Sequence, residues 1–208
     1  MNESLNDGQK IADPPEFSII TFQQTPKVTH LDPADTPDWI KGNYDLVDRF
    51  VKFSNSIENA LGLAANQVAR KGKRLDCPFF IWRNEMNATC PINIAINPTI
   101  NEKFGNPVSE IEGCLSWPGF RVHAQRHLRV NVSYWNLNGD HIENQDLGRF
   151  PSQVWQHEMD HLLGVEEIIK QAKEAFVRVE KKVQRNDPCP CGKAIDGKPK
   201  KYKKCCGR

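Results

Sequence analysis

The stretch QHEMDHLLGV at residues 156–165 decides how the rest of this sequence is interpreted. His157 and His161 are four residues apart, so in a helix both imidazoles lie on one face and can bind the same ion. Glu158, beside the first histidine, can then act as a base. Two protein ligands are too few for a catalytic zinc ion, which usually has three. The pattern therefore predicts a metal site whose third ligand lies elsewhere in the chain.

Cys114 is the best candidate for this third ligand, because a thiolate binds zinc and iron strongly. It lies in IEGCLSWPGF (residues 111–120), where Gly113 and the following Pro-Gly turn would let the end of a strand approach a metal closely. Two nitrogens and one sulfur would leave a fourth position for water. We expect the remaining isolated cysteines and histidines to be ordinary structural or surface residues: Cys77, Cys90, His30, His123, His127 and His141.

The whole chain has an ordinary soluble composition, with 208 residues, 38% hydrophobic and 26% charged. One domain with a short appendage is expected. No 18 apolar residues run together and the N-terminus has no apolar segment, so we expect neither a membrane span nor secretion, and a cytoplasmic protein. Most of the seven cysteines are bunched at the end of the chain, which favours metal ligation over a disulfide framework.

Hydrophobic periodicity predicts helices on both sides of a β-rich middle. Residues 44–59 have helical spacing, whereas residues 78–82, 92–98 and 130–137 have the pattern of strands. The second strand is expected to stop at Pro98, and the third at the turn Asn138-Gly139. An amphipathic helix is predicted after Gly164, over residues 166–185. These elements predict an α+β fold with strands around a central helix that carries HEMDH.

Three segments in this order, GLAANQ (62–67), EGCLS (112–116) and QHEMDH (156–161), resemble the motifs of the peptide deformylases, metal-dependent enzymes that remove the N-formyl group from nascent polypeptides. The resemblance covers residues 44–170. It implies that Cys114, His157 and His161 bind the metal. It also implies that metal-bound water is the nucleophile and that Glu158 is general base and acid.

The resemblance assigns further roles around this centre. The side-chain amide of Gln67 and the backbone N–H of Leu115 would stabilise the oxyanion. Glu112 and Arg126 would form a buried ion pair that ties the end of the EGCLS strand to its neighbour. The residues expected to line the pocket for the substrate methionine are Leu61, Phe150 and Val154. The backbones of Gly62 and Gly113 are expected to bind the substrate chain. Arg121 is also expected to bind substrate, but it could equally be a plain surface residue. Apolar residues at Phe150 and Val154 would also suit an ordinary core.

The sequence departs from the family pattern at three positions. Ala60 replaces the glycine that usually opens the first motif, which affects any backbone geometry that needs a missing Cβ, and we expect this change to be tolerated. Trp117 stands where a smaller apolar residue is common, and Trp155 adds bulk to the helix. Together the two tryptophans are expected to narrow the entrance or to alter substrate preference.

The C-terminal tail is a separate feature. Its four cysteines, Cys189, Cys191, Cys205 and Cys206, form a CxC pair and a CC pair that could close a structural Zn²⁺ site. The stretch resembles the SEC-C zinc module of the bacterial preprotein translocase motor, with a longer loop between the pairs. Residues 170–208 hold 13 Lys and Arg against 4 Asp and Glu, which indicates an anionic or protein partner such as the ribosome, or simply a solvated tail.

These observations together predict a peptide-deformylase-like α+β metallohydrolase with a flexible N-terminus (1–16), a catalytic domain (17–185) and a zinc-binding tail (186–208). Its expected substrates are N-formylmethionyl peptides, with no membrane and no specific DNA as partner. The donor set accepts Fe²⁺, Zn²⁺ or Ni²⁺, and the resemblance implies ferrous iron as the native metal. Two alternatives stay open: a general HExxH metallopeptidase, and a non-catalytic zinc adaptor on the same fold.

Overall fold

A computed structural model describes residues 15–87, 89–166, 169–170, 194–195, 198–199 and 201. In this part of the chain the helices are α1 (Thr36–Ser56), the short 3₁₀ helix η1 (Ala65–Gln67) and α2 (Arg149–Leu163). The strands are β1 (Phe17–Ile19), β2 (Gly62–Ala64), β3 (Val68–Arg70), β4 (Lys73–Arg74), β5 (Phe79–Trp82), β6 (Asn93–Phe104), β7 (Val108–Cys114), β8 (Trp117–Arg126), β9 (Arg129–Trp135), β10 (His141–Gly148), β11 (Ala194–Ile195) and β12 (Lys198–Pro199).

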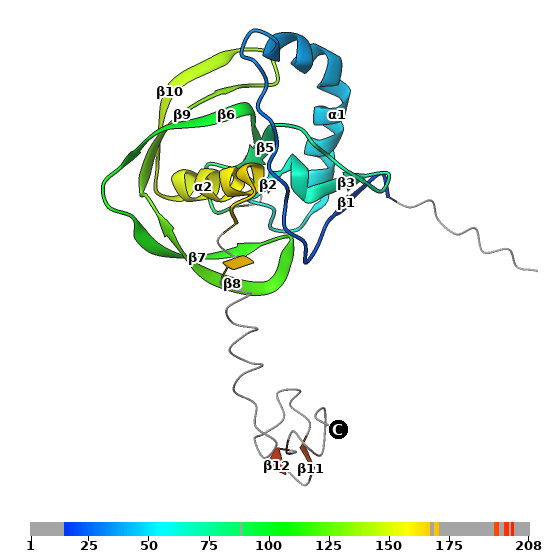
Figure 1. Cartoon of the computed structure of the whole chain (residues 1–208), viewed down its shortest axis with the longest axis vertical. Coiled ribbons are helices and arrows are strands. Elements are labelled where there is room, and N and C mark those ends of the chain that lie inside the picture. The colour runs from blue at the N-terminus through cyan, green and yellow to red at the C-terminus, as the bar shows by residue number, and fades with distance from the viewer. Residues whose placement is uncertain are drawn as a thin grey trace, which may run out of the picture.

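Antiparallel sheets surround helix α2. The largest sheet has the strand order β10-β9-β6-β5-β2, a smaller one has the order β1-β3-β4, and β7 pairs with β8. Helix α2 lies between the large sheet and the β7–β8 pair, and it contacts strands of both (Figure 1). The predicted α+β fold with strands around a central helix is therefore confirmed.

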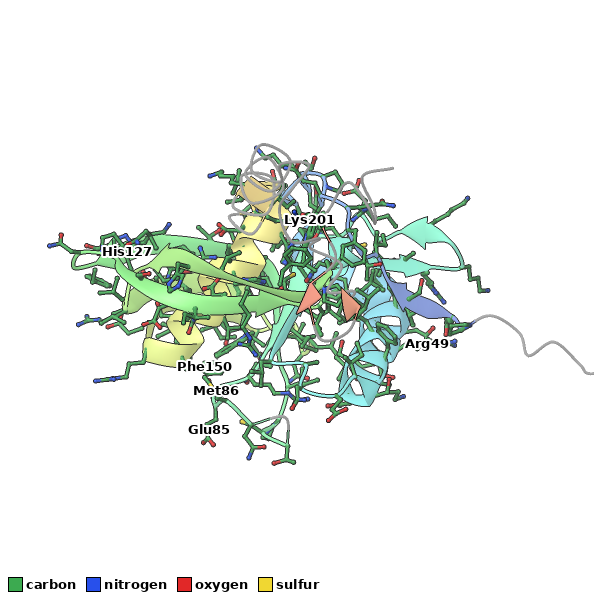
Figure 2. The ribbon with its side chains drawn as sticks, turned by 90° about the horizontal axis from the view of Figure 1, so that it is seen from below. Arg49, Glu85, Met86, His127, Phe150 and Lys201 are labelled. Carbon is green, nitrogen blue, oxygen red and sulfur yellow. The ribbon has the colours of Figure 1, made fainter. Side chains whose placement is uncertain are left out.

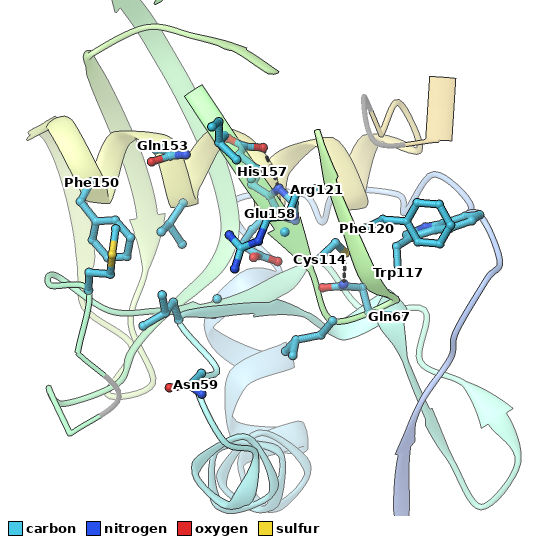
Figure 3. A pocket seen from close by; sticks show the side chains of 18 of the residues that line it. Asn59, Gln67, Cys114, Trp117, Phe120, Arg121, Phe150, Gln153, His157 and Glu158 are labelled. Atoms are coloured by element: carbon cyan, nitrogen blue, oxygen red, sulfur yellow. Dashed lines mark hydrogen bonds and ion pairs between the residues drawn. The ribbon is translucent and has the colours of Figure 1, made fainter. Parts of the chain in front are cut away.

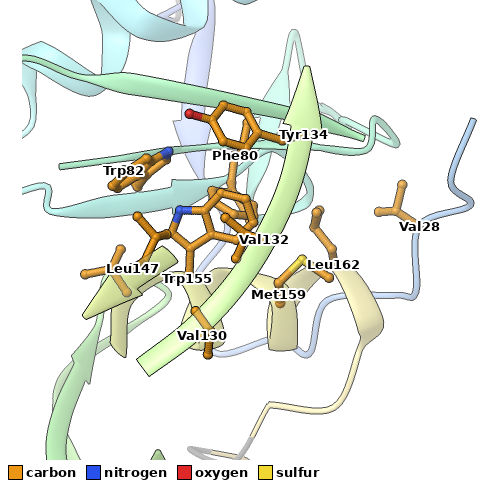
Figure 4. Close-up of a cluster of buried hydrophobic side chains, with 13 residues drawn as sticks. Val28, Phe80, Trp82, Val130, Val132, Tyr134, Leu147, Trp155, Met159 and Leu162 are labelled. Carbon is orange, nitrogen blue, oxygen red and sulfur yellow. The ribbon is translucent and has the colours of Figure 1, made fainter. Parts of the chain in front are cut away.

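Strand β5 joins two hydrophobic cores, one on each face of the large sheet. Phe80 and Trp82 face the core around α2, shown in Figure 4, whereas Phe79 and Ile81 pack into the core under α1. Successive side chains of a strand point to opposite faces, so a strand covered on both faces is apolar throughout. This explains why the run PFFIW has no alternation.

Helix α1 begins at Thr36, earlier than predicted from the apolar periodicity alone. Pro37 lies in its first turn, where a proline needs no hydrogen-bonded N–H, and Asp38 adds a negative charge at the positive end of the helix. The helix ends at Ser56, and Ile57 is already extended. The prediction over residues 44–59 is thus correct in type, but the helix begins earlier and ends at Ser56 instead of running into the segment 60–67.

Strand β6 does not stop at Pro98, so that expectation was wrong. The register with β9 shifts between Ile96 and Thr99, which places Pro98 in a bulge where its missing N–H breaks no ladder bond. Asn97 enters the bulge with a φ of 52°, and its side-chain amide bonds the backbone of Leu31 in both directions, at 3.0 Å each. A side chain thus replaces the strand pairing that the bulge interrupts.

Trp155 has a different place from the one expected. Its side chain is fully buried and packs edge-on against Phe80, Trp82 and Tyr134, with ring centroids 4.8, 5.9 and 5.4 Å away. It therefore belongs to the core on one face of α2 and cannot narrow a substrate entrance. The expectation failed because bulk on a helix says nothing about which face carries it.

The predicted helix over residues 166–185 and the tail lie almost wholly outside the described residues. Ile169 and Lys170 are helical, and β11 pairs with β12 in a short antiparallel hairpin. The four tail cysteines are not among the described positions. No helix within the described ranges is long and apolar enough to cross a membrane.

Replacing Trp155 by alanine is expected to destabilise the fold by about 3–5 kcal/mol, because it opens a cavity in a closed aromatic core. Urea denaturation of the apoprotein measures the change in the free energy of unfolding. Leu163→Ala on the same helix is the control, since Leu163 is 38% exposed and should change stability by less than about 0.5 kcal/mol. Equal effects of the two substitutions would contradict the burial of Trp155.

Candidate metal centre and active site

Two elements bring the three predicted metal ligands together. Strand β7 ends at Cys114, where its register with β8 shifts, and α2 carries His157 and His161 on one face. The Cys114 Sγ and His157 Nε2 atoms both approach His161 Nε2, at 3.3 Å each. One ligand atom from each residue lies within 4.8 Å of the other two. One sulfur and two nitrogens can thus surround a single ion.

A carboxylate lies behind each of the two histidines. Glu112 Oε2 is 2.9 Å from His157 Nδ1, and Glu166 Oε1 is 3.2 Å from His161 Nδ1. A proton on each Nδ1 leaves the Nε2 lone pair free to point at the centre, which is how carboxylates orient metal-binding imidazoles. The one sulfur and two nitrogen donors, with a carboxylate behind each imidazole, therefore fit a divalent transition metal.

Arg126 connects the two elements that carry the ligands. Its guanidinium donates to both oxygens of Glu112, at 2.8 and 2.9 Å, and to Asp160 Oδ2 at 2.7 Å. Burial raises the pKa of Glu112, but hydrogen bonds from Arg126 and His157 outweigh it and lower the pKa to about 2. Glu112 thus stays negatively charged. Through its contacts with Glu112 and Asp160, Arg126 of β8 also connects β7 to α2.

The protonation of the free ligands opposes metal binding at low pH. Burial raises the pKa of the Cys114 thiol, yet hydrogen bonds to His157 and His161 outweigh it and lower the pKa to about 6. Burial lowers the pKa of His161, but its bonds to Cys114 and Glu166 raise it to about 9. A metal must displace protons from the imidazoles, so binding should strengthen as pH rises.

Glu158 is packed against the backbone of β2. A Cβ built on Gly62 would lie only 2.3 Å from Glu158 Oε1, so this approach requires glycine. The carboxylate is buried, and its Oε2 has no hydrogen-bond partner within the described part of the chain. Burial raises the pKa of Glu158 to about 7. The side chain can therefore both take up and release a proton near neutral pH.

Gln67 is held with its amide nitrogen toward the metal ligands. The Ala64 N–H donates to Gln67 Oε1 at 2.8 Å, while Gln67 Nε2 donates to Ser116 Oγ at 3.1 Å and Cys114 Sγ at 3.4 Å. Leu115 follows Cys114 directly.

Ala60 stands where the resemblance leads one to expect a glycine. It is buried and its φ is not left-handed; the neighbouring Asn59 has the positive φ, 60°.

A cleft of about 680 Å³ opens onto this centre (Figure 3). Its lining includes Gln67, Leu115, Glu158, two of the metal ligands and every residue predicted to bind substrate: Leu61, Gly62, Gly113, Arg121, Phe150 and Val154. Trp117 also lines the cleft and packs edge-on against Phe22 and Phe120. The structure thus brings the residues predicted for substrate binding and catalysis into one cavity, whereas His161 lies behind it and the predicted tail cysteines lie outside the described residues.

Some residues of the site had no signal in the sequence. Met86 lies in the loop before β6 and lines the cleft, although its side chain is 75% exposed. Glu166 lies beyond the end of α2 and reaches His161 only because Gly164, with a φ of 68°, reverses the chain. A glycine after the helical pattern predicts such a turn, but not which side chain it brings back.

Known proteins resemble this chain over the same region. A family model described as polypeptide deformylase matches residues 20–175. A peptide deformylase of Thermotoga neapolitana is 46% identical over 124 residues, covering 58% of this chain and 68% of that protein. One of Thermodesulfovibrio yellowstonii is 33% identical over 150 residues, covering 72% and 87%. The crystal structure of the Thermotoga maritima peptide deformylase superposes with a TM-score of 0.57 at 27% identity, covering 75% of this chain and 97% of that one.

Replacing Cys114 by alanine is expected to remove about one equivalent of bound metal per chain, because two imidazoles alone hold a divalent ion weakly. Elemental analysis after gel filtration measures the metal content. Cys90→Ala is the matched control, because Cys90 is also a half-buried free thiol but lies outside the ligand group. Unchanged metal content in Cys114→Ala would mean that the ion sits elsewhere.

Proposed function

The chain belongs to the polypeptide deformylase family, hydrolases that remove the N-formyl group from nascent peptides, and we propose which of its residues perform each part of that reaction. Formyl-methionyl peptides are the substrates of this family. The observation that carries the proposal is the convergence of Cys114, His157 and His161, with Glu158 and Gln67 lining the cleft that opens onto them. A general metallopeptidase and a non-catalytic zinc adaptor, the two alternatives, are not favoured by the similarities above.

Cys114, His157 and His161 hold the catalytic divalent ion in this proposal. When bound, the ion lowers the pKa of a coordinated water from about 15.7 toward about 7 and polarises the formyl carbonyl. Thiolate and imidazole donors suit Fe²⁺, Zn²⁺ and Ni²⁺ alike. Fe²⁺ is the proposed native metal because the family resemblance implies it.

Glu158 handles the proton. Its buried carboxylate, with one oxygen free of hydrogen bonds, takes a proton from the attacking water and later gives it to the leaving amine. The pKa of about 7 supports both directions of transfer near neutral pH.

Gln67 and Leu115 stabilise the negative charge that develops on the formyl oxygen. The support for Gln67 is its fixed orientation, with Oε1 bound to a backbone N–H and Nε2 directed toward the Cys114 side. The family resemblance implies the Leu115 backbone N–H as the second donor, and Leu115 lines the cleft next to Cys114. Each such donor typically contributes about 100- to 1000-fold to the rate.

The substrate methionine occupies the apolar part of the cleft in this proposal. Leu61, Phe150 and Val154 line it, and Met86, from the loop before β6 and near Phe150 in Figure 2, adds an apolar wall. The backbones of Gly62 and Gly113 bind the peptide chain on either side, and Arg121 meets substrate further along. A flexible thioether in the wall suits a substrate side chain that is itself a thioether.

Glu158→Gln is expected to lower kcat for formate release from formyl-Met-Ala-Ser by about 100- to 10,000-fold, because it removes the proton acceptor and keeps the size of the side chain. The metal content should stay at the wild-type value, since Glu158 is not a ligand in this account. Formate is measured with a coupled dehydrogenase on anaerobically loaded protein. Full turnover in the variant, or cleavage of internal peptide bonds by the wild type, would defeat the assignment.

Gly62→Ala should reduce kcat by roughly 100-fold, because the new Cβ displaces the Glu158 carboxylate from its position. Gly42→Ala in α1 is the matched control, since its Cβ would meet nothing within 4 Å. A kinetic comparison of the two alanine variants, at equal metal content, measures the effect. Equal rates would show that the close contact between Gly62 and Glu158 has no catalytic importance.

We also propose that residues 17–185 form the catalytic domain and that residues 186–208 form a SEC-C-like module. In this module Cys189, Cys191, Cys205 and Cys206 hold a structural Zn²⁺. Six lysines between 193 and 204 would then present a cationic surface to the ribosome or another protein. A cytoplasmic location stays a prediction from the sequence.

Replacing Cys205 and Cys206 together by serine should release about one zinc ion and weaken ribosome cosedimentation, while formate release stays at the wild-type rate. Elemental analysis and sedimentation at increasing salt measure the two effects. Serine variants that bind ribosomes as tightly as the parent chain would remove the tail from the account of partner binding.

A further inference from the structure

Glu166 is a buried carboxylate to which the reaction above gives no task. It is 2% exposed and lies just beyond the C-terminal end of α2. Gly164 takes the left-handed conformation there, and the Val165 N–H then bonds back to the Asp160 carbonyl at 3.0 Å. The chain is therefore reversed, and Glu166 points toward the helix end that carries His161.

Within the described ranges, the Glu166 side chain makes polar contacts with two residues, Thr25 and His161. Its Oε1 accepts a hydrogen bond from the Thr25 N–H, at 2.7 Å, and contacts the Thr25 hydroxyl, whose one proton can go to Glu166 Oε1 or to the His161 carbonyl at 2.8 Å. The same oxygen lies 3.2 Å from His161 Nδ1, within ion-pair distance, and this buried nitrogen has no partner of hydrogen-bond geometry in the described chain. A buried carboxylate costs free energy unless it is paired, so its pairing with the His161 ring explains its presence.

The two carboxylates behind the metal ligands differ in their surroundings. Glu112 shares its charge between His157 and the guanidinium of Arg126. Glu166 has no cation other than His161 in ion-pair contact within the described ranges. Its negative charge acts on the His161 ring, which strengthens the ring as an electron donor, and it also stabilises the charge of Arg74 without an ion-pair contact.

We infer that Glu166, held by Thr25, is a positioning residue that fixes the His161 ring with Nδ1 protonated and Nε2 directed at the metal. The inference rests on the proposed metal centre and deepens it: the affinity of this centre depends on a carboxylate outside the three motifs. It also depends on the segment that holds that carboxylate.

That segment, residues 20–28, runs behind the centre and is bonded to several of its parts. Its backbone N–H groups donate to the carbonyls of Gln67, Ser116 and Leu162, each at 2.8 Å. The Asn66 amide bridges the Pro26 and His161 carbonyls, at 3.0 and 2.7 Å. Thr25 is thus fixed relative to α2, and it can hold Glu166 in place when the metal is absent.

The test measures metal release by folded protein. Full-length wild type, Glu166→Leu, Glu166→Gln and Glu102→Gln are loaded with Co²⁺ and challenged with excess EDTA, and the loss of the visible thiolate–cobalt absorption is followed. Glu166→Leu should bind Co²⁺ about 10- to 100-fold more weakly and release it faster. Glu166→Gln should fall between Leu and wild type, because an amide oxygen still accepts a hydrogen bond but carries no charge. Glu102→Gln, at an exposed carboxylate on β6, should match the wild type.

Folding is checked on the apoproteins by thermal denaturation. If Glu166→Leu does not fold, the rates of Co²⁺ release from Thr25→Val and Thr25→Ser are compared instead, because only serine keeps the hydroxyl donor. The inference predicts faster release in the valine variant alone. Release at the wild-type rate from a folded Glu166→Leu protein, or equal release from both Thr25 variants, overturns it.

The tail cysteines are common to all these proteins, so differences in Co²⁺ release among them report on the centre formed by Cys114, His157 and His161. A wild type that binds Co²⁺ but releases no formate would defeat the proposed function and leave this readout intact.

Discussion

The constraint on which this structure depends is that three donor atoms from two separate elements must meet at one point. Cys114 ends a strand, whereas His157 and His161 lie on a helix that comes later in the chain. A displacement of either element by about 1 Å would spoil the geometry of the site. The molecule accordingly joins the two elements directly, through the buried contacts of Arg126 with Glu112 on β7 and Asp160 on α2.

Helix α2 meets this constraint because its two faces have different tasks. Trp155, Met159 and Leu162 are buried in the aromatic and aliphatic core against the large sheet. His157 and Glu158 line the cleft on the other side. Burial of the apolar face stabilises the position of the helix. The face toward the cleft can therefore carry charged groups whose burial would otherwise destabilise the helix. The cost of burying His157 is offset by its contact with Glu112, whereas burial of Glu158 is uncompensated and raises its pKa.

Much of the fold and of the site could be predicted, where the signal is local. HExxH spacing places two imidazoles on one helical face, the run at 78–82 is a buried strand, and Asn138-Gly139 makes the turn before β10, with a φ of 85° at the glycine. The failures have a common origin in tertiary contacts. Pro98 is accommodated by a bulge that the Asn97 side chain completes, and Trp155 turns inward because three aromatic rings receive it. Glu166 reaches the site only through a chain reversal and a partner, Thr25, that lies far away in sequence.

The most direct measurement is the position of the metal itself. Crystals of the full chain loaded with Co²⁺, with diffraction data collected on either side of the cobalt absorption edge, would locate the ion by its anomalous signal. The account predicts a peak bonded to Cys114 Sγ, His157 Nε2 and His161 Nε2, with the Glu158 carboxylate beside it but not bonded to it. A peak without the Cys114 sulfur, or with Glu158 as a ligand in its place, would contradict the account.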